Sequence, residues 1–386
     1  MKIPFHKVYT SGRELDYMRD CIDRGQIAGD GHYTKKVQDF IQERFGAFRV
    51  FLTTSGTAAL EMAALLIDLQ PGDEVIMPSF AFASAANAVL LRGARPVFVD
   101  IDPATLNMAV DVIEAHVSER TRAIMPVHYA GVACAMNEIM DIAQRHHLMV
   151  IEDAAQAVDA TYEGRYLGTI GQLGCYSFHA TKNIACGEGG ALLVNTPDRA
   201  ILERADILWE KGTNRRQFVL GLTDKYTWME VGSSYLPSDL LAAFLYGQLE
   251  QMEEITARRH HIYDYYKGLL QEFEDAGLLQ LPHPPAEAGP NYHIFYCLFN
   301  NSQHRNWVMS KAAERGIQST FHFIPLHSSP MGMKLGYQAG DLPVTEDLSG
   351  RLLRLPLYPS LSPAELEYVG ENLGEILAEL KTSGAG

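Results

Sequence analysis

EVIMPSFAFASAANAVLLRGARPVFVD, residues 74–100, contains two short apolar runs with a helical pattern between them. The first run (74–77) stops at Pro78, residues 83–92 favour a helix, and the second run covers residues 96–100. Continuous apolar runs of this length are typical of strands that are buried on both faces. The stretch therefore predicts a strand, a helix and a second strand that lies parallel to the first.

The same alternation continues on both sides of this stretch. Further strands are expected at 50–52, 123–127, 149–153 and 191–194, and further helices at 58–68 and 137–146. Strands and helices in strict succession predict a doubly wound, largely parallel α/β sheet.

The pattern changes after residue 194. A long helical stretch from about 238 to 270 predicts a link to a second domain, and the remainder mixes strand and helix patterns. We therefore expect a large domain over residues 1–245 and a smaller C-terminal α/β domain over residues 246–386.

Composition limits the class of protein. The 386 residues are 47% hydrophobic and 20% charged, which is typical of a globular protein with a sizeable core. The net charge of −15 argues against a nucleic-acid partner, because such partners require a dense basic face. No stretch approaches the ~18 apolar residues of a membrane span, and the five cysteines include no C-x-x-C pair. We expect a cytoplasmic protein with reduced thiols, no membrane contact and no metal site.

The segment TSGTAAL, residues 54–60, places small hydroxyl residues and a glycine between a predicted strand and a predicted helix. Free backbone N–H groups at the start of a helix suit a phosphate. An ordinary helix cap explains the segment equally well, and the spacing of a nucleotide P-loop is missing.

The segment IEDAAQ, residues 151–156, ends a predicted buried strand with acidic residues. Ligands bind at the carboxyl ends of strands in open α/β sheets, and a buried carboxylate requires a cationic partner. Asp153 could therefore hold a protonated pyridine nitrogen, although a helix cap or a metal ligand fits the same position.

The segment CYSFHATKN, residues 175–183, is followed by GEGG at 187–190. A lysine in a partly desolvated pocket loses its proton more readily and can form a Schiff base. Glycines just behind Lys182 permit close backbone approach beside a bulky ring. A lysine whose stem alone is buried is the plain alternative.

A phosphate site, a strand-end Asp and a lysine ~30 residues later are the parts that hold pyridoxal 5′-phosphate (PLP), in this order. The arrangement resembles the DegT/StrS-type family of sugar-nucleotide aminotransferases, which are fold-type-I PLP enzymes. The motifs that carry the resemblance are SGTAAL, PSFAFAS, PVHYAG, EDAAQA, SFHATKN and GEGG. It extends from Gly12 to Pro359 and implies a mostly parallel seven-stranded sheet between helices in the large domain.

The resemblance also implies roles for the two charged residues. Lys182 is expected to form the Schiff base with PLP and then to move the proton between substrate and cofactor carbons. Asp153 is expected to pair with the pyridine nitrogen and to keep it protonated.

Five further residues are implied to bind the cofactor. Gly56, Thr57 and Ser177 would bind the phosphate, Phe82 would stack on the pyridine ring, and Gln156 would reach the phenolic oxygen or the substrate. From the residues alone, Phe82 fits a core aromatic, and Gln156 and Ser177 fit local bonds to the backbone.

One position departs from the family pattern. Many members place an Asn from the neighbouring subunit on the phosphate, in an Asn-Tyr-Arg-Met segment, where this chain has SYLP at residues 234–237. Ser234 can donate only one hydrogen bond there. The resemblance implies a homodimer with shared active sites.

The stretches ELDYM (14–18), KGTNR (211–215), DKYTW (224–228) and IPLH (324–327) resemble the branch that makes dTDP-4-amino-4,6-dideoxygalactose. The resemblance implies transfer of an amino group from L-glutamate to C4 of dTDP-4-keto-6-deoxy-D-glucose, a TDP-linked 4-keto-6-deoxyhexose. The substrate-site residues it implies are Tyr129, Lys211, His322 and His327. A surface polysaccharide, such as an O-antigen or an enterobacterial-type antigen, is the expected destination of the product.

Three alternatives stay open at this point. The same chemistry could give the gluco epimer or a 3-amino sugar. A dehydratase of the same family would replace Lys182 with His, and the lysine is present. A non-enzymatic regulator with this fold would carry an N-terminal DNA-binding module and a less acidic chain.

Overall fold

The large sheet has seven strands in the order β1-β9-β8-β5-β4-β2-β3, in a computed structural model that describes residues 1–383. The strands are β1 (Arg49–Thr53), β2 (Glu74–Pro78), β3 (Arg95–Val99), β4 (Thr121–Ile124), β5 (Met149–Asp153), β8 (Leu173–Ser177) and β9 (Gly190–Val194). The strands β3, β2, β4, β5 and β8 pair in parallel, whereas β9 is antiparallel to both of its neighbours. The prediction of a mostly parallel seven-stranded sheet is confirmed.

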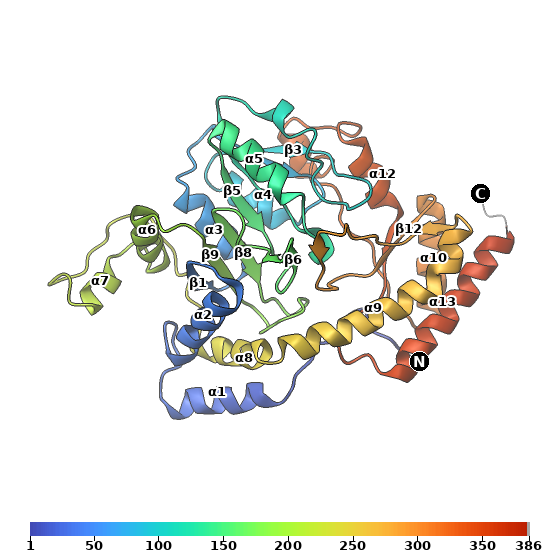
Figure 1. Cartoon of the computed structure of the whole chain (residues 1–386), viewed down its shortest axis with the longest axis horizontal. Coiled ribbons are helices and arrows are strands. Elements are labelled where there is room, and N and C mark those ends of the chain that lie inside the picture. The colour runs from blue at the N-terminus through green and yellow to red at the C-terminus, as the bar shows by residue number, and fades with distance from the viewer. Residues whose placement is uncertain (384–386) are drawn as a thin grey trace.

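Helices cover both faces of this sheet (Figure 1). One face packs against α2 (His32–Phe45), α5 (Met136–His146) and α8 (Asp239–Leu249), and the other packs against α3 (Gly56–Leu66), α4 (Ala83–Leu90) and α6 (Arg199–Trp209). Successive strand residues alternate between the two cores: Val50 and Leu52 pack in the first, and Phe51 packs in the second. Burial on both faces explains why the strands are apolar throughout.

The C-terminal part forms a second core around a three-stranded antiparallel sheet in the order β10-β12-β13. Its strands are β10 (Leu279–Gln280), β12 (Tyr296–Phe299) and β13 (Leu352–Arg354). Its helices are α9 (Met252–Asp275), α10 (Ser302–Glu314), α11 (Pro330–Lys334), α12 (Pro343–Arg351) and α13 (Pro363–Ser383). Helix α9 spans both cores, because Ile255 packs with the large sheet and Ile262 packs in the C-terminal core. The domain boundary after residue 245 remains a prediction.

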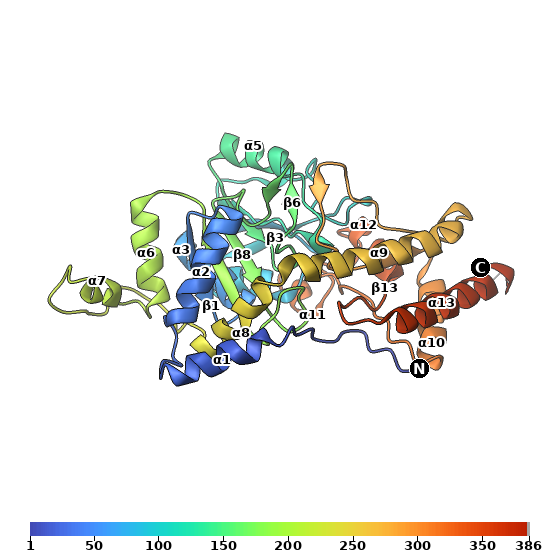
Figure 2. The same cartoon turned by 60° about the horizontal axis from the view of Figure 1, so that its bottom comes forward.

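The helix expected over 238–270 is interrupted. Helix α8 ends at Leu249 and α9 begins at Met252, and the N–H of Gln251 bonds to the carbonyl of Gln248, three residues back. Glu250, at this break, accepts hydrogen bonds from Arg13 and Tyr17 of α1 (Arg13–Asp23) at 3.0 and 2.6 Å. The contact fixes the end of α8 against α1, which runs alongside it (Figure 2).

Two short pairings join the parts of the chain. Strand β11 (Ala288–Gly289) pairs with β6 (Thr161–Tyr162), which pairs with β7 (Arg165–Tyr166). The N-terminal segment crosses to the C-terminal part, where Ile3 pairs with Ile317 (Figure 2).

A projecting segment, residues 212–233, is called the arm here. It carries the short helix α7 (Arg215–Val219) and extends away from the rest of the molecule (Figure 1). Across residues 1–383, no helix combines the length and the apolar character needed to cross a bilayer.

Candidate active site

A cavity of about 480 Å³ lies where β5 and β8 end, and their last residues, Asp153 and Ser177, contribute to its lining. This is the edge of an α/β sheet at which ligands bind. Most of the predicted cofactor residues line one side, called the sheet wall here: Gly56, Thr57, Phe82, Asp153, Gln156, Ser177 and Lys182. The opposite side, called the C-terminal wall, includes Arg259, His293, His322 and Arg354.

The start of α3 forms one end of the sheet wall. Ser55 caps the helix by accepting the N–H of Ala58 at 3.0 Å, and the other first-turn N–H groups, at Gly56 and Thr57, have no acceptor within their own helix. A Cβ on Gly56 would lie 2.8 Å from the Cβ of Ser177. The loop therefore needs glycine to bring two N–H groups and the Ser177 hydroxyl together, as a phosphate requires.

Gly190 serves a different contact from the one expected of the glycines behind Lys182. A Cβ at Gly190 would lie 2.4 Å from the carbonyl of Ser55 and 2.5 Å from the nitrogen of Gly56. The close approach is thus between the backbone of β9 and the start of α3.

Two adjacent acids of β5 point to opposite faces of the sheet, as alternation along a strand requires. Asp153 lines the cavity, is 5% exposed and accepts only the N–H of Ala155, at 3.2 Å, among the described residues. Burial raises the pKa of Asp153, and the positive charge of Lys182 partly opposes the rise. A cation in the cavity would stabilise the ionised form.

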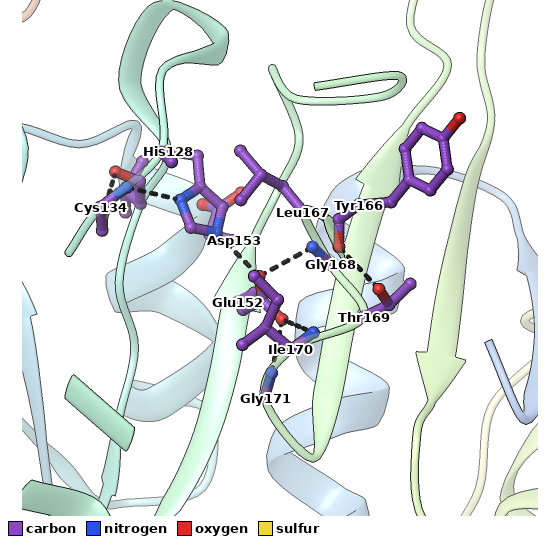
Figure 3. A network of polar contacts seen from close by, with 12 residues as sticks. His128, Cys134, Glu152, Asp153, Tyr166, Leu167, Gly168, Thr169, Ile170 and Gly171 are labelled. Atoms are coloured by element: carbon purple, nitrogen blue, oxygen red, sulfur yellow. Dashed lines mark hydrogen bonds and ion pairs between the residues drawn. The ribbon is translucent and has the colours of Figure 1, made fainter. Parts of the chain in front are cut away.

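Glu152 is fully buried and does not line the cavity, and its side chain lies in a network of polar contacts (Figure 3). Its carboxylate accepts the N–H groups of Gly168, Ile170 and Gly171 at 2.6–2.8 Å, and it lies 2.9 Å from Nε2 of His128. The N–H of Cys134 donates to Nδ1 of His128, so the imidazole proton lies on Nε2 and faces Glu152. This network holds a loop against β5 and leaves Asp153 as the acid of β5 that faces the cavity.

Lys182 follows β8 in a turn closed by its N–H and the carbonyl of His179. Burial lowers the pKa of Lys182 to about 8, and Asp153 partly offsets the effect. The amine therefore loses its proton more readily than that of an ordinary lysine, and the neutral amine is the form that attacks a carbonyl.

Phe82 and Gln156 complete the sheet wall. Phe82 is 62% exposed, so its ring is available to a flat ligand. The side-chain oxygen Oε1 of Gln156 accepts the N–H of Ala130 at 2.8 Å. The NH₂ group of the same side chain is therefore the end that can donate. The bond to Ala130 reaches a residue 26 positions away in the sequence, so it is not the local backbone bond considered as the alternative for Gln156, and the residue also lines the cavity.

The C-terminal wall was missed in the sequence, except for His322. Asn183 donates to the carbonyl of Asn291 at 2.8 Å and accepts from Nδ1 of His293 at 2.8 Å, so Nε2 of His293 carries the lone pair. Burial, Lys182 and Arg259 hold the pKa of His293 well below its usual range. The only sequence signal was the position of Asn183 next to Lys182.

His322 lines the cavity, and Tyr129 holds it from behind. The two side chains are 3.2 Å apart (phenol oxygen to Nδ1), and burial raises the pKa of Tyr129, so the phenol donates. Burial, Arg354 and Lys182 lower the pKa of His322 to about 2, so its ring is neutral. Tyr129 is 1% exposed and lies outside the cavity lining.

Besides Tyr129, three predicted site residues lie outside the cavity of their own chain. His327 is fully buried between Ser79 and Glu346, at 2.7 and 2.8 Å. Lys211 and Ser234 are exposed at the base of the arm. The structure thus gives His327 a structural contact that joins the residue after β2 to α12.

The residues present fit PLP. An N–H cradle with a serine suits the phosphate, buried Asp153 suits a pyridinium, and Lys182 has a lowered pKa in the same cavity. Within the described part of the chain, no group of three or more His, Cys, Asp or Glu side chains is placed to hold a metal ion.

Comparison with known proteins identifies the family of the chain. The profile of the DegT/DnrJ/EryC1/StrS aminotransferase family matches residues 9–374. The chain is 32% identical to the GDP-perosamine synthase of Escherichia coli O157:H7, over 98% of this chain and 99% of that protein. It is 35% identical to the spore coat polysaccharide biosynthesis protein SpsC of Bacillus subtilis (strain 168), over 97% of each.

A solved structure agrees as well. The aminotransferase TlmJ from Streptoalloteichus hindustanus superposes with a TM-score of 0.90 at 30% identity, over 98% of this chain and 100% of that chain. The chain belongs to the DegT/DnrJ/EryC1/StrS aminotransferase family and is a PLP-dependent sugar aminotransferase.

Proposed function

We propose that the protein moves the amino group of L-glutamate to C4 of dTDP-4-keto-6-deoxy-D-glucose. The products are dTDP-4-amino-4,6-dideoxy-D-galactose and 2-oxoglutarate. The observation that carries the chemistry is the placement of Lys182 and Asp153 in one cavity with the start of α3. The choice of sugar rests on the four stretches at 14–18, 211–215, 224–228 and 324–327, which resemble one branch of the family.

Each residue of the sheet wall has a proposed task. Bound PLP supplies an electron sink that makes the α-proton of an amino acid acidic. Lys182 would anchor the cofactor, and its amine would carry that proton between the α-carbon of the substrate and a carbon of the cofactor. Asp153 keeps the pyridine nitrogen protonated, and Gly56, Thr57 and Ser177 bind the phosphate.

We further propose a homodimer. The arm exposes Phe218, Val219, Leu220, Leu222, Trp228 and Met229. Apolar residues gathered on a projecting segment are typical of a protein interface. Ser234 lies at the base of the same arm and outside its own cavity, which supports a contact with the partner's cofactor phosphate.

A cytoplasmic location is part of the proposal, and the five buried free cysteines support it. We also propose that the product enters a surface polysaccharide, such as an O-antigen or an enterobacterial-type antigen. The name of the B. subtilis relative is consistent with that destination.

Absorbance spectra of the PLP-loaded protein test the proposal. We expect a yellow band that L-glutamate bleaches and that dTDP-4-keto-6-deoxy-D-glucose restores. The name of the E. coli relative carries GDP, so a GDP-linked 4-keto-6-deoxyhexose is the matched comparison. Restoration by the GDP sugar alone would contradict the TDP assignment, and product NMR separates the galacto epimer from the gluco epimer and the 3-amino sugar.

A further inference from the structure

Two arginines of the C-terminal wall lack a carboxylate partner. Within residues 1–383, neither Arg259 nor Arg354 forms a salt bridge. A buried or half-buried guanidinium normally has an acidic partner, because desolvation of an unpaired charge is costly. A pair of such groups that lines one cavity indicates a site for an anionic ligand.

Arg259 is held rigidly. It is 2% exposed and donates to the carbonyls of Tyr292 and His293 at 3.0 and 2.6 Å. Both partners are neutral, so the positive charge of Arg259 is uncompensated and acts on the cavity. Burial and the neighbouring Arg354 lower the pKa of Arg259 to about 9.

Arg354 is the half-buried member of the pair. Its Nε is buried and has no hydrogen-bond partner, and its guanidinium lies 4.8 Å from the centre of the Phe5 ring. Backbone bonds to Thr320 in both directions, at 2.7 and 3.2 Å, fix its place at the end of β13. Stacking on an aromatic ring leaves the guanidinium edge free for a planar oxyanion.

Arg354 lines the cavity together with Lys182 and His322. Burial lowers the pKa values of both groups, and the positive charge of Arg354 adds to the effect. Hydrogen bonds connect this wall to the lysine, because Arg259 donates to the carbonyl of His293, and His293 bonds Asn183, the residue after Lys182. The other acid of the lining, Glu188, has a side chain that is 64% exposed and lies 3.6 Å from Nε2 of His179.

We propose that Arg354, supported by Arg259, binds the α-carboxylate of the amino donor. The inference rests on the proposed function and adds a residue that recognises the amino acid serving as amino donor. The α-carboxylate is one bond from the carbon that carries the amine, so a cation that lines the same cavity as Lys182 is placed to bind it. The phosphate of PLP belongs at the start of α3, and the diphosphate of a sugar nucleotide is separated from C4 by the pyranose ring.

Binding of 2-oxoglutarate and of TDP to the PLP-loaded protein, measured by calorimetry, tests the inference. Arg354→Gln should weaken the binding of 2-oxoglutarate about 10- to 100-fold, because a hydrogen-bonded charge is lost. The same change should alter the affinity for TDP less than about twofold. Arg354→Lys keeps the charge without the planar fork and should be intermediate. Arg305→Gln is the matched control, since Arg305 also has a buried, unpartnered Nε beside an aromatic ring and lies outside the cavity.

The outcomes separate this inference from the proposed function. If glutamate bleaches the wild-type protein and Arg354→Gln binds 2-oxoglutarate as tightly as wild type does, the inference is wrong and the function stands. If Arg354→Gln weakens TDP instead, the arginine belongs to the sugar nucleotide. If glutamate does not bleach the wild-type protein, the proposed function is wrong.

Discussion

The sheet wall and the C-terminal wall of one cavity differ in how the chain builds them. The sheet wall comes from residues 56–182, mostly at the ends of strands and the starts of helices. The C-terminal wall joins Arg259, His293, His322 and Arg354 from four segments. Neighbours of Arg259, His293 and Arg354 pack in the second core, and a neighbour of His322 packs in a separate cluster. Local motifs therefore encode the cofactor side of the site, and tertiary assembly creates the side proposed to select the substrates.

The largest expected effect is on the sheet wall. Lys182→Ala should reduce transamination by at least about 10⁴-fold, because both the anchor and the proton carrier are lost. The measurement is a coupled assay of 2-oxoglutarate release, with circular dichroism to show that the fold is kept. Activity near that of wild type would remove Lys182 from the mechanism.

The two acids of β5 give the sharpest test of the comparison. Asp153→Asn should lower the rate about 10²–10³-fold, the usual effect of removing one preorganised charge, without loss of stability. Glu152→Gln should instead lower the free energy of unfolding by about 3 kcal/mol, because its three N–H donors and His128 lose a charged acceptor. Rate assays and urea unfolding of both variants check this. If Asp153→Asn lost as much stability as Glu152→Gln, Asp153 would have a structural role like that of Glu152, which would contradict the expected difference.

The smallest effect is expected behind the C-terminal wall. Tyr129→Phe removes one hydrogen bond to a neutral His322, so we expect a rate loss of a few-fold and about 1 kcal/mol of stability. The change should appear in how the rate depends on substrate concentration, while the absorbance spectrum of the bound cofactor stays unchanged. A shifted cofactor spectrum would place Tyr129 on the cofactor side.

The comparison also explains what the sequence could predict. Alternating apolar runs and helices indicated the sheet, and the motifs around Gly56, Asp153 and Lys182 indicated the residues that share the cavity. The break between α8 and α9 depends on contacts of Glu250 with α1, which no local pattern encodes. Arg354 lies within the range of the resemblance, but its lack of a partner is visible only in three dimensions.

The role of His327 shows the same limit. A histidine in a segment that borders the substrate in related proteins was expected at the site. Its side chain instead bonds Ser79 and Glu346 and is fully buried. Proximity in sequence to His322 did not show which way the ring points.

The most direct test of the central claim is to reduce the PLP-loaded protein with borohydride and map the labelled peptide by mass spectrometry. Borohydride fixes a Schiff base as a stable amine at the lysine that forms it. We expect one pyridoxyl label on Lys182 and no label at that site in Lys182→Ala. A label on a different lysine of the wild-type protein, or none on a yellow preparation, would contradict it.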